Sequence, residues 1–123
     1  MPARFSSRPH AAYDRGYFDK WYRHPEHRVS TVAKTTRKAL LALAVAEYYL
    51  ERPARTVLDV GCGEGQWQLV LKKLRPRLRY TGVDPSPYAV GRFGKRRNIF
   101  MGSFGNLPEL GDCYDLIVCS DSL

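Results

Sequence analysis

The stretch Thr56-Val-Leu-Asp-Val-Gly-Cys-Gly-Glu-Gly65 decides the fold, because it is an apolar run that breaks into alternate glycines. Apolar β-branched residues suit a parallel strand that is buried on both faces. Glycine allows the positive φ angles and the close backbone approach that a tight turn around a ligand requires. Residues 66–74 follow with apolar side chains at helical spacing. The loop is therefore predicted to lead into a helix whose free N–H groups face a ligand.

A second short strand is predicted at Tyr80-Thr-Gly-Val-Asp84, and it too ends in an acidic residue. In dinucleotide-binding folds an acid at this place accepts hydrogen bonds from a ribose diol. The alternative is that Asp84 caps the helix that begins near Ser86, because aspartate is a common N-cap residue. Two further strands are expected within residues 98–108 and 114–120. Strands that alternate with helices predict an α/β fold with a right-handed, doubly wound parallel sheet.

The spacing of the glycines separates the families of nucleotide-binding proteins. Nicotinamide-dependent enzymes use G-x-G-x-x-G, whereas Gly61, Gly63 and Gly65 form G-x-G-x-G. The Walker phosphate loop is excluded, because no Lys-Ser or Lys-Thr pair follows the glycines. With Asp59 two residues before the first glycine, the pattern resembles the class I S-adenosylmethionine-dependent methyltransferases. The resemblance implies a Rossmann-like sheet with strands in the order 3-2-1-4-5-7-6, of which this chain supplies the 3-2-1-4 side.

The resemblance also implies the cofactor, S-adenosyl-L-methionine, and a role for each candidate residue. Asp59 is expected to contact the methionine moiety and Asp84 to hold the ribose hydroxyls. Pro85 and Ser86 are expected to turn the chain away beside the adenine. The loop that passes close under the cofactor comprises Gly61, Cys62, Gly63, Glu64 and Gly65.

The expected adenine-binding turn departs from the family pattern. That turn often carries an acid after its glycine, but here Ser103 follows Gly102. Ser103 or the backbone of Phe104 is expected to make the contact instead. Two acids belong to the fourth strand: Asp115 is expected to be a turn or edge residue, and Asp121 lies just past the end of the strand, where ligands of open α/β sheets collect.

The activity implied by the resemblance is methyl transfer, most simply to a small-molecule acceptor. In the family the general base and the acceptor pocket come largely from elements after the fourth strand, so no catalytic residue is assigned. The chain stops at Leu123, directly after that strand, which leaves an apolar sheet edge of a kind that proteins usually protect. We therefore expect a fragment of a longer methyltransferase, truncated after strand four. The alternatives are an edge covered by a second copy and a non-catalytic fragment that associates through this edge.

The charge of the chain adds RNA as an alternative acceptor. The formal net charge is +8, and residues up to Arg55 hold eleven basic against five acidic side chains. Two further basic clusters lie at residues 72–79 and 95–97. A basic surface with interleaved aromatic residues can follow a phosphate backbone. The alternative interpretation is that these basic residues form a solvated surface.

The region before the first strand is expected to form a separate layer. Residues 1–28 are interpreted as a basic, aromatic N-terminal segment and residues 29–123 as a partial methyltransferase domain. Tyr13, Tyr17 and Trp21 recur at helical spacing, which suits either a lid over the cofactor or packing on the core. A helix from Ser30 to about residue 51 is predicted, with Ser30 as its N-cap. Its expected apolar face comprises Val32, Ala39, Leu40, Leu43, Ala46 and Leu50.

The remaining sequence features favour a cytoplasmic protein without a metal. No apolar run is long enough to cross a bilayer, and the N-terminus has no apolar signal core. Cys62, Cys113 and Cys119 lack metal-ligand spacing and are interpreted as reduced thiols. His24 and His27 flank a helix-breaking proline, which argues against a metal pair. Cys62 is expected to be a small packing residue, because the acceptor attacks the cofactor directly.

Overall fold

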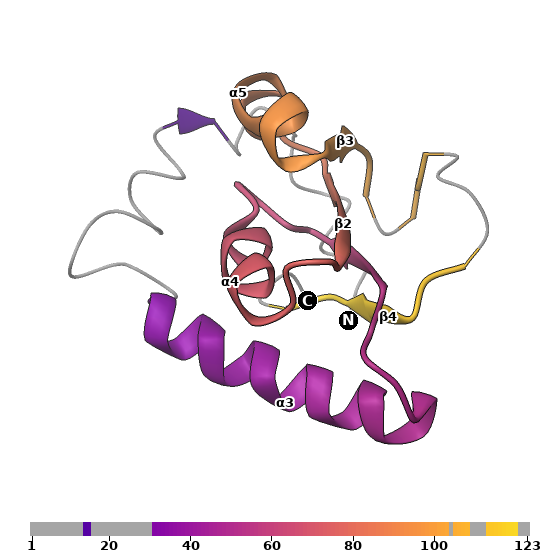
Figure 1. Cartoon of the computed structure of the whole chain (residues 1–123). Helices are drawn as coiled ribbons and strands as arrows, with labels where there is room; N and C mark the ends of the chain where they lie inside the picture. The colour runs from indigo at the N-terminus through magenta and orange to yellow at the C-terminus, as the bar shows by residue number, and fades with distance from the viewer. Residues whose placement is uncertain (1–13, 16–30, 104, 109–112, 121–123) are drawn as a thin grey trace, which may run out of the picture.

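The computed structural model describes Asp14, Arg15 and residues 31–103, 105–108 and 113–120. Its centre is a four-stranded parallel sheet with helices packed against it (Figure 1). The strand order is β3-β2-β1-β4, and each pairing is parallel. The predicted α/β class and the predicted strand order are confirmed. The elements are α3 (Val32–Leu50), β1 (Thr56–Val60), α4 (Gln66–Leu74), β2 (Arg79–Asp84), α5 (Pro87–Arg97), β3 (Ile99–Met101) and β4 (Leu116–Val118).

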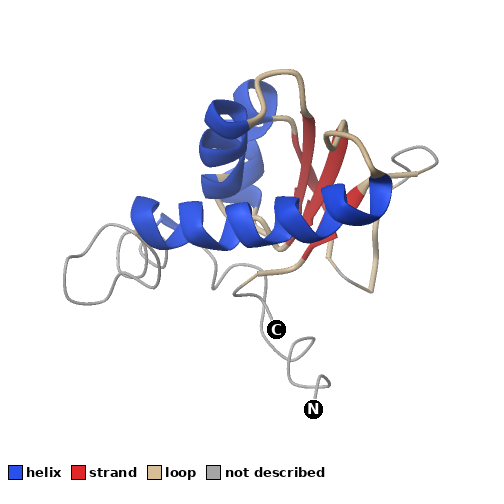
Figure 2. Ribbon diagram, turned by 60° about the horizontal axis from the view of Figure 1, so that its bottom comes forward, coloured by secondary structure: helices blue, strands red, loops and turns tan. Residues whose placement is uncertain are grey.

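The main core lies between the sheet and the three helices, which all cover the same face (Figure 2). Leu43 of α3 and Leu71 of α4 are fully buried there together with Val57 of β1. Burying one such side chain contributes about 1.5–3 kcal/mol to folding. Phe93 of α5 belongs to the same cluster. A doubly wound sheet has a layer of helices on each face, and these three helices form one of those layers.

The opposite face of the sheet carries a smaller apolar cluster of Leu58, Val60 and Val83. Side chains alternate between the two faces of a strand, so β1 directs Val57 and Asp59 toward the helices and its other apolar residues away from them. In the part of the chain that the structure describes, no helix lies on this second face. Ile117 of β4 pairs with Leu58 and is 62% exposed.

The helix before the first strand differs from its prediction at its start and in its buried face. Its N-cap is Thr31, whose hydroxyl accepts the N–H of Lys34; Ser30 lies outside the described residues. Val32 is 69% exposed and Leu40 is 47% exposed, so the predicted face is wrong at these two positions. The buried positions are Thr35, Ala39 and Leu43. The helix packs along α4 through this narrow i, i+4 stripe, which leaves its broader apolar surface outside.

An ion pair joins the end of α3 to the start of β4. The guanidinium of Arg52 donates two hydrogen bonds to Asp115, at 2.8 and 3.0 Å. The N–H of Arg55 donates a third, at 2.7 Å. Asp115 thus holds the segment before β1 against β4. This structural role agrees with the expectation that Asp115 is a turn or edge residue and not a ligand-binding residue.

The acid sensitivity of the fold is expected to depend on Asp115. The hydrogen bonds from Arg52 and from the N–H of Arg55 hold the pKa of Asp115 well below its ordinary value of 3.8. The unfolded chain therefore takes up this proton first, so the stabilisation is complete above about pH 5 and is lost as the pH falls toward the folded-state pKa. We expect Asp115→Asn to lower the melting temperature near neutral pH. We also expect the melting temperature of the variant to fall less than that of the wild type when the pH is lowered from neutral to about 3. Thermal unfolding at both pH values measures this, and an unchanged pH dependence in the variant would contradict it.

Candidate functional site

The glycine loop follows β1 directly and adopts the conformation that its sequence predicts. Gly61, Gly63 and Gly65 have φ angles of 73°, 58° and 83°. These left-handed values are available to glycine at little cost and are strained for other residues. The turn is fastened to the neighbouring strand, because the N–H groups of Gly61 and Cys62 both donate to the carbonyl of Val83, at 2.7 and 3.1 Å.

Helix α4 begins at the end of this loop with an N-terminus that no side chain caps. Its N-cap is Gly65, which makes no side-chain capping hydrogen bond. Most helices use a serine, threonine, aspartate or asparagine at this position to accept one of the first N–H groups. The N–H of Gln68 donates to the carbonyl of Gly65 at 3.0 Å, but no side chain covers the positive end of the helix dipole, which can therefore face a ligand.

Asp84, at the end of β2, connects the glycine loop to the next helix. Its Oδ2 accepts the N–H of Gly63 at 2.7 Å, and its Oδ1 accepts the N–H of Ser86 at 2.9 Å. The N-cap of α5 is Ser86, whose Oγ accepts the N–H of Ala89. The alternative that Asp84 caps this helix is therefore wrong. These two hydrogen bonds orient both oxygens of a carboxylate, a group with about four lone-pair sites.

Asp59 has a partner that the sequence did not predict. The hydroxyl of Tyr80 donates to Oδ2 of Asp59 at 2.7 Å, and both side chains are buried. Burial, with the charge of Asp59 beside it, raises the pKa of Tyr80 well above its ordinary value, so the hydroxyl stays protonated as the donor. The sequence does contain a signal for this contact: side chains alternate along β2, so Tyr80 lies on the same face of the sheet as Gly82 and Asp84.

Cys62 is a packed residue of the loop. It belongs to the main core cluster. Burial, together with the charges of Asp59 and Asp84, raises the pKa of its thiol well above the ordinary value. A thiol is nucleophilic as its thiolate, so Cys62 is held in the unreactive form, which agrees with its prediction as a packing residue.

Three acidic side chains are buried at this end of the sheet. Asp59 is 2% exposed, Glu64 is 3% exposed and Asp84 is 6% exposed. The backbone carbonyl of Glu64 accepts a hydrogen bond from Arg97 at 2.6 Å, which fixes the loop to the end of α5. Acidic groups repel phosphate and attract cations, so this arrangement suits a ligand that is cationic or rich in hydroxyl groups.

The structure describes only some of the other residues predicted for the site. Pro85 is half-buried between Asp84 and the N-cap of α5. Ser103 is half-buried in a turn whose backbone pairs with Asn106. This turn lies beside the end of β2, because the N–H of Gly102 donates to the carbonyl of Asp84 at 3.1 Å. Phe104 and Asp121 lie outside the described residues, as do the aromatic positions and the histidines of the N-terminal segment.

The described residues contain no candidate metal site and no candidate membrane span. In that part of the chain, no three histidine, cysteine, aspartate or glutamate side chains gather as a metal site would need. None of the described helices is long and apolar enough to span a bilayer. Cys62, Cys113 and Cys119 are all free thiols.

Comparison with known proteins gives one family and several relatives. Residues 22–123 match the model of a family described as a methyltransferase domain. The chain is 38% identical over 71 residues to the ribosomal protein L11 methyltransferase of Cupriavidus taiwanensis, a match that covers 55% of this chain and 24% of the relative. It is 36% identical over 80 residues to the ribosomal RNA small subunit methyltransferase H of Trichlorobacter lovleyi, covering 58% and 26%.

Solved structures show the same fold. The plantazolicin methyltransferase BpumL, in complex with a pentazolic desmethylPZN analog and SAH, superposes with a TM-score of 0.61 at 19% identity. The match covers 95% of this chain and 49% of BpumL. The chain thus spans about a quarter of the length of these curated relatives and about half of the length of this solved structure.

Proposed function

The chain belongs to the methyltransferase domain family, and from this premise we propose that its glycine loop binds S-adenosyl-L-methionine as the donor in a methyl-transfer reaction. The observation that carries the proposal is the set of three buried acidic side chains around a glycine loop and an uncapped helix. A phosphate-bearing nucleotide would meet repulsion there. The solved relative BpumL, which has the same fold, was crystallised with SAH.

The residues present fit this cofactor in charge and in hydrogen-bonding capacity. Its sulfonium and amino groups are cationic, which suits the buried Asp59 and Glu64. Its ribose has two hydroxyls, which suit the carboxyl of Asp84, already aligned by the N–H groups of Gly63 and Ser86. We propose that Tyr80 fixes the orientation of Asp59 toward the methionine moiety through their 2.7 Å hydrogen bond. The proposed contacts of Gly61, Cys62, Gly65, Pro85, Ser103 and Phe104 follow from the family resemblance.

The chemistry follows from the cofactor, which supplies a methyl group that is already activated by the positive sulfur. The residues of this chain therefore bind and orient. Positioning two reactants in line supplies much of the rate in such a reaction. Where the acceptor is a hydroxyl or an ammonium group, a general base must take its proton. We assign that base to no residue of this chain.

A small molecule is the acceptor that we propose first. It is supported by the fold shared with BpumL, whose solved complex holds a desmethylPZN analog. RNA is the second candidate, supported by the sequence match to a ribosomal RNA methyltransferase and by the basic surface of α4 and α5. A cytoplasmic location is part of the proposal, supported by the three free cysteines. The division into residues 1–28 and 29–123, with the first part as a possible lid or a core layer, remains a proposal too.

A labelled-methyl experiment tests the reaction and separates the two acceptor classes. The chain is incubated with S-adenosylmethionine labelled in its methyl group, together with a small-molecule extract and purified total RNA. We expect new labelled products in the acid-soluble fraction. Label that appears only in precipitated RNA would overturn the small-molecule acceptor in favour of the second candidate. Equilibrium dialysis of the same labelled cofactor is the control, and absence of binding there would contradict the proposed function itself.

A further inference from the structure

The surface formed by α4, β2 and α5 is almost entirely of one sign. Residues 66–98 hold nine lysines and arginines and a single acid, Asp84, which is buried. Protein surfaces normally mix charges of both signs, because a field of one sign repels itself. Seven of the nine basic side chains are exposed: Lys72, Lys73, Arg77, Arg79, Arg92, Lys95 and Arg96. We call these seven residues the basic face.

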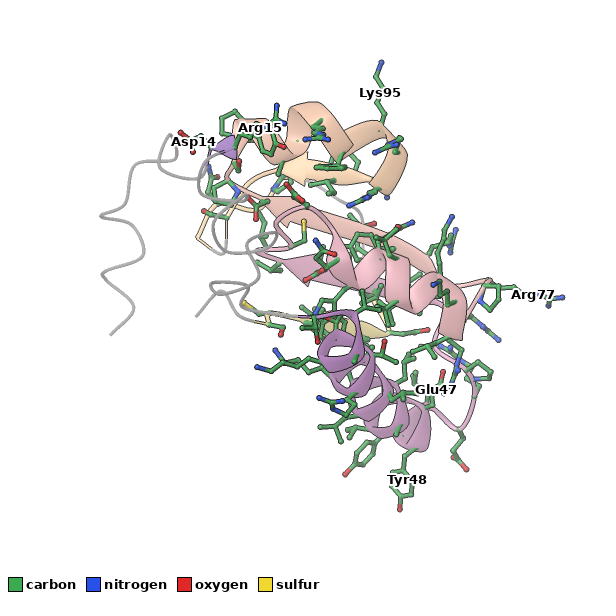
Figure 3. The ribbon with its side chains drawn as sticks, turned by 90° about the vertical axis from the view of Figure 1, so that its left-hand side faces the viewer. Asp14, Arg15, Glu47, Tyr48, Arg77 and Lys95 are labelled. Atoms are coloured by element: carbon green, nitrogen blue, oxygen red, sulfur yellow. The ribbon has the colours of Figure 1, made fainter. Side chains whose placement is uncertain are left out.

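Six of the seven members of the basic face come from segments next to the start of β2: the end of α4, the loop that follows it, the first residue of β2 and the end of α5. Helix α4 ends in Lys72 and Lys73, and α5 ends in Lys95 and Arg96. The C-cap of α5, Asn98, donates from its side chain to the carbonyl of Tyr80 at 2.9 Å, which brings the end of α5 against the beginning of β2. Figure 3 shows Lys95 extending from the top of the molecule and Arg77 extending from its right-hand edge, both away from its body.

Three guanidinium groups are gathered around one aromatic ring on α5. Those of Arg92, Arg96 and Arg97 lie 5.2, 5.7 and 4.3 Å from the centre of the Phe93 ring. Burial, and then the charge of Arg96, lowers the pKa of Arg97. Like charges held this close repel one another, and an anion bound among them relieves the repulsion.

Two cations elsewhere in the described chain pair with carboxylates. Arg52 pairs with Asp115 and Arg75 pairs with Glu47, at 2.8 and 2.6 Å. Among the described residues, no comparable ion pair involves a member of the basic face. Within the described part of the chain, the positive charge of the basic face is therefore left available to an anionic partner.

We propose that the basic face binds the phosphate backbone of single-stranded RNA. Separate cations along α5, at the end of α4 and at the start of β2 suit a repeating anion, and arginine forms bidentate hydrogen bonds with phosphate. An anionic membrane is the competing polyanion. A membrane-binding helix inserts large apolar residues beside its cations, whereas the exposed positions of α5 beyond Pro87 are Gly91, Arg92, Lys95, Arg96 and the C-cap Asn98.

The basic face also extends toward the glycine loop. Arg92 lies six residues after the N-cap Ser86, or about 9 Å along the helix axis. Residues 86–91 contain no basic side chain, so the basic face ends at Arg92, short of Asp84. Binding itself does not rest on methyl transfer, so its failure would leave the proposed cofactor site untouched, and failure of the cofactor site would leave this surface intact.

Fluorescence anisotropy with a labelled oligouridylate of about twelve nucleotides tests the proposal. Each phosphate contact to a single strand contributes about −0.7 to the slope of log K against log salt, so four or five contacts predict a slope near −3. Lys95→Gln/Arg96→Gln is expected to reduce that slope by about 1.4 and the affinity at least about tenfold at 0.1 M salt.

The matched control is Lys34→Gln/Arg37→Gln, which removes the same charge from two exposed positions of α3, at the opposite end of the helical layer (Figure 1). We expect less than about a threefold loss for this variant. An equal loss in both double variants would overturn the proposal in favour of attraction by net charge alone. Binding to phosphatidylserine vesicles without binding to the oligonucleotide would overturn it in favour of a membrane. Circular dichroism checks that each variant keeps the helix content of the wild type.

Discussion

Replacing Asp84 by alanine is expected to weaken the binding of S-adenosylhomocysteine by about a hundredfold or more. In the proposed site this carboxyl accepts both ribose hydroxyls, and a hydrogen bond to a charged group contributes about 1.5–3 kcal/mol. Two such bonds exceed about 2.7 kcal/mol, which is a factor of a hundred in affinity. Calorimetric unfolding with the ligand at a hundred times the wild-type dissociation constant should raise the unfolding free energy of the wild type by about 2.7 kcal/mol and that of the variant by no more than about 0.4 kcal/mol.

The control for this prediction is Asp84→Asn, because alanine also removes the acceptor of two buried N–H groups. Those of Gly63 and Ser86 lose their partner in Asp84→Ala, and an unsatisfied buried donor costs about 1–3 kcal/mol. Asparagine keeps the volume and one acceptor oxygen. We expect Asp84→Asn to unfold closer to the wild type and still lose at least about tenfold in affinity. A folded variant with wild-type affinity would remove Asp84 from the site.

Replacing Gly82 by alanine is expected to destabilise the fold by about 2–3 kcal/mol, the cost of forcing extra atoms into a packed core. A Cβ at this position would lie 2.7 Å from Sγ of Cys62 and 2.9 Å from the hydroxyl of Tyr80. Relief of the clash must move the glycine loop or break the hydrogen bond between Tyr80 and Asp59, so ligand affinity is expected to fall as well. Urea denaturation and ligand titration measure the two effects.

The matched control is Gly91→Ala, the same chemical change on the exposed side of α5. A Cβ there meets no atom within 4 Å, and alanine favours a helix over glycine by about 0.5–1 kcal/mol. We expect this variant to be slightly more stable than the wild type and to bind the ligand equally well. If Gly82→Ala were as stable as Gly91→Ala, the close packing of β2 against the loop would be disproved.

The sheet could be predicted because its signals are local. An apolar run that ends in Gly61, Gly63 and Gly65 specifies a strand and a turn over a few residues, and the acids Asp59 and Asp84 mark the strand ends. The family resemblance then supplied the strand order, which no local signal contains. The roles of these residues toward the cofactor remain predictions.

The contacts that could not be predicted depend on neighbours far apart in the sequence. Tyr80 reaches Asp59 because β1 and β2 pair in one register among several that the sequence allows. The buried face of α3 was mispredicted for a related reason. Leu40, Leu41 and Val45 make most sides of this helix apolar, so the periodicity selects no single face, and packing against α4 decides which residues are covered.

Backbone amide NMR of the isotopically labelled chain, titrated with S-adenosylhomocysteine, tests the central claim most directly, since it reports both binding and its location. The account predicts that the largest shifts occur at Gly61, Gly63, Gly65 and Asp84, at the carboxyl ends of β1 and β2. It predicts little change along the outer surface of α3. Saturating ligand that leaves the glycine-loop amides unmoved would contradict the claim that this loop is the cofactor site.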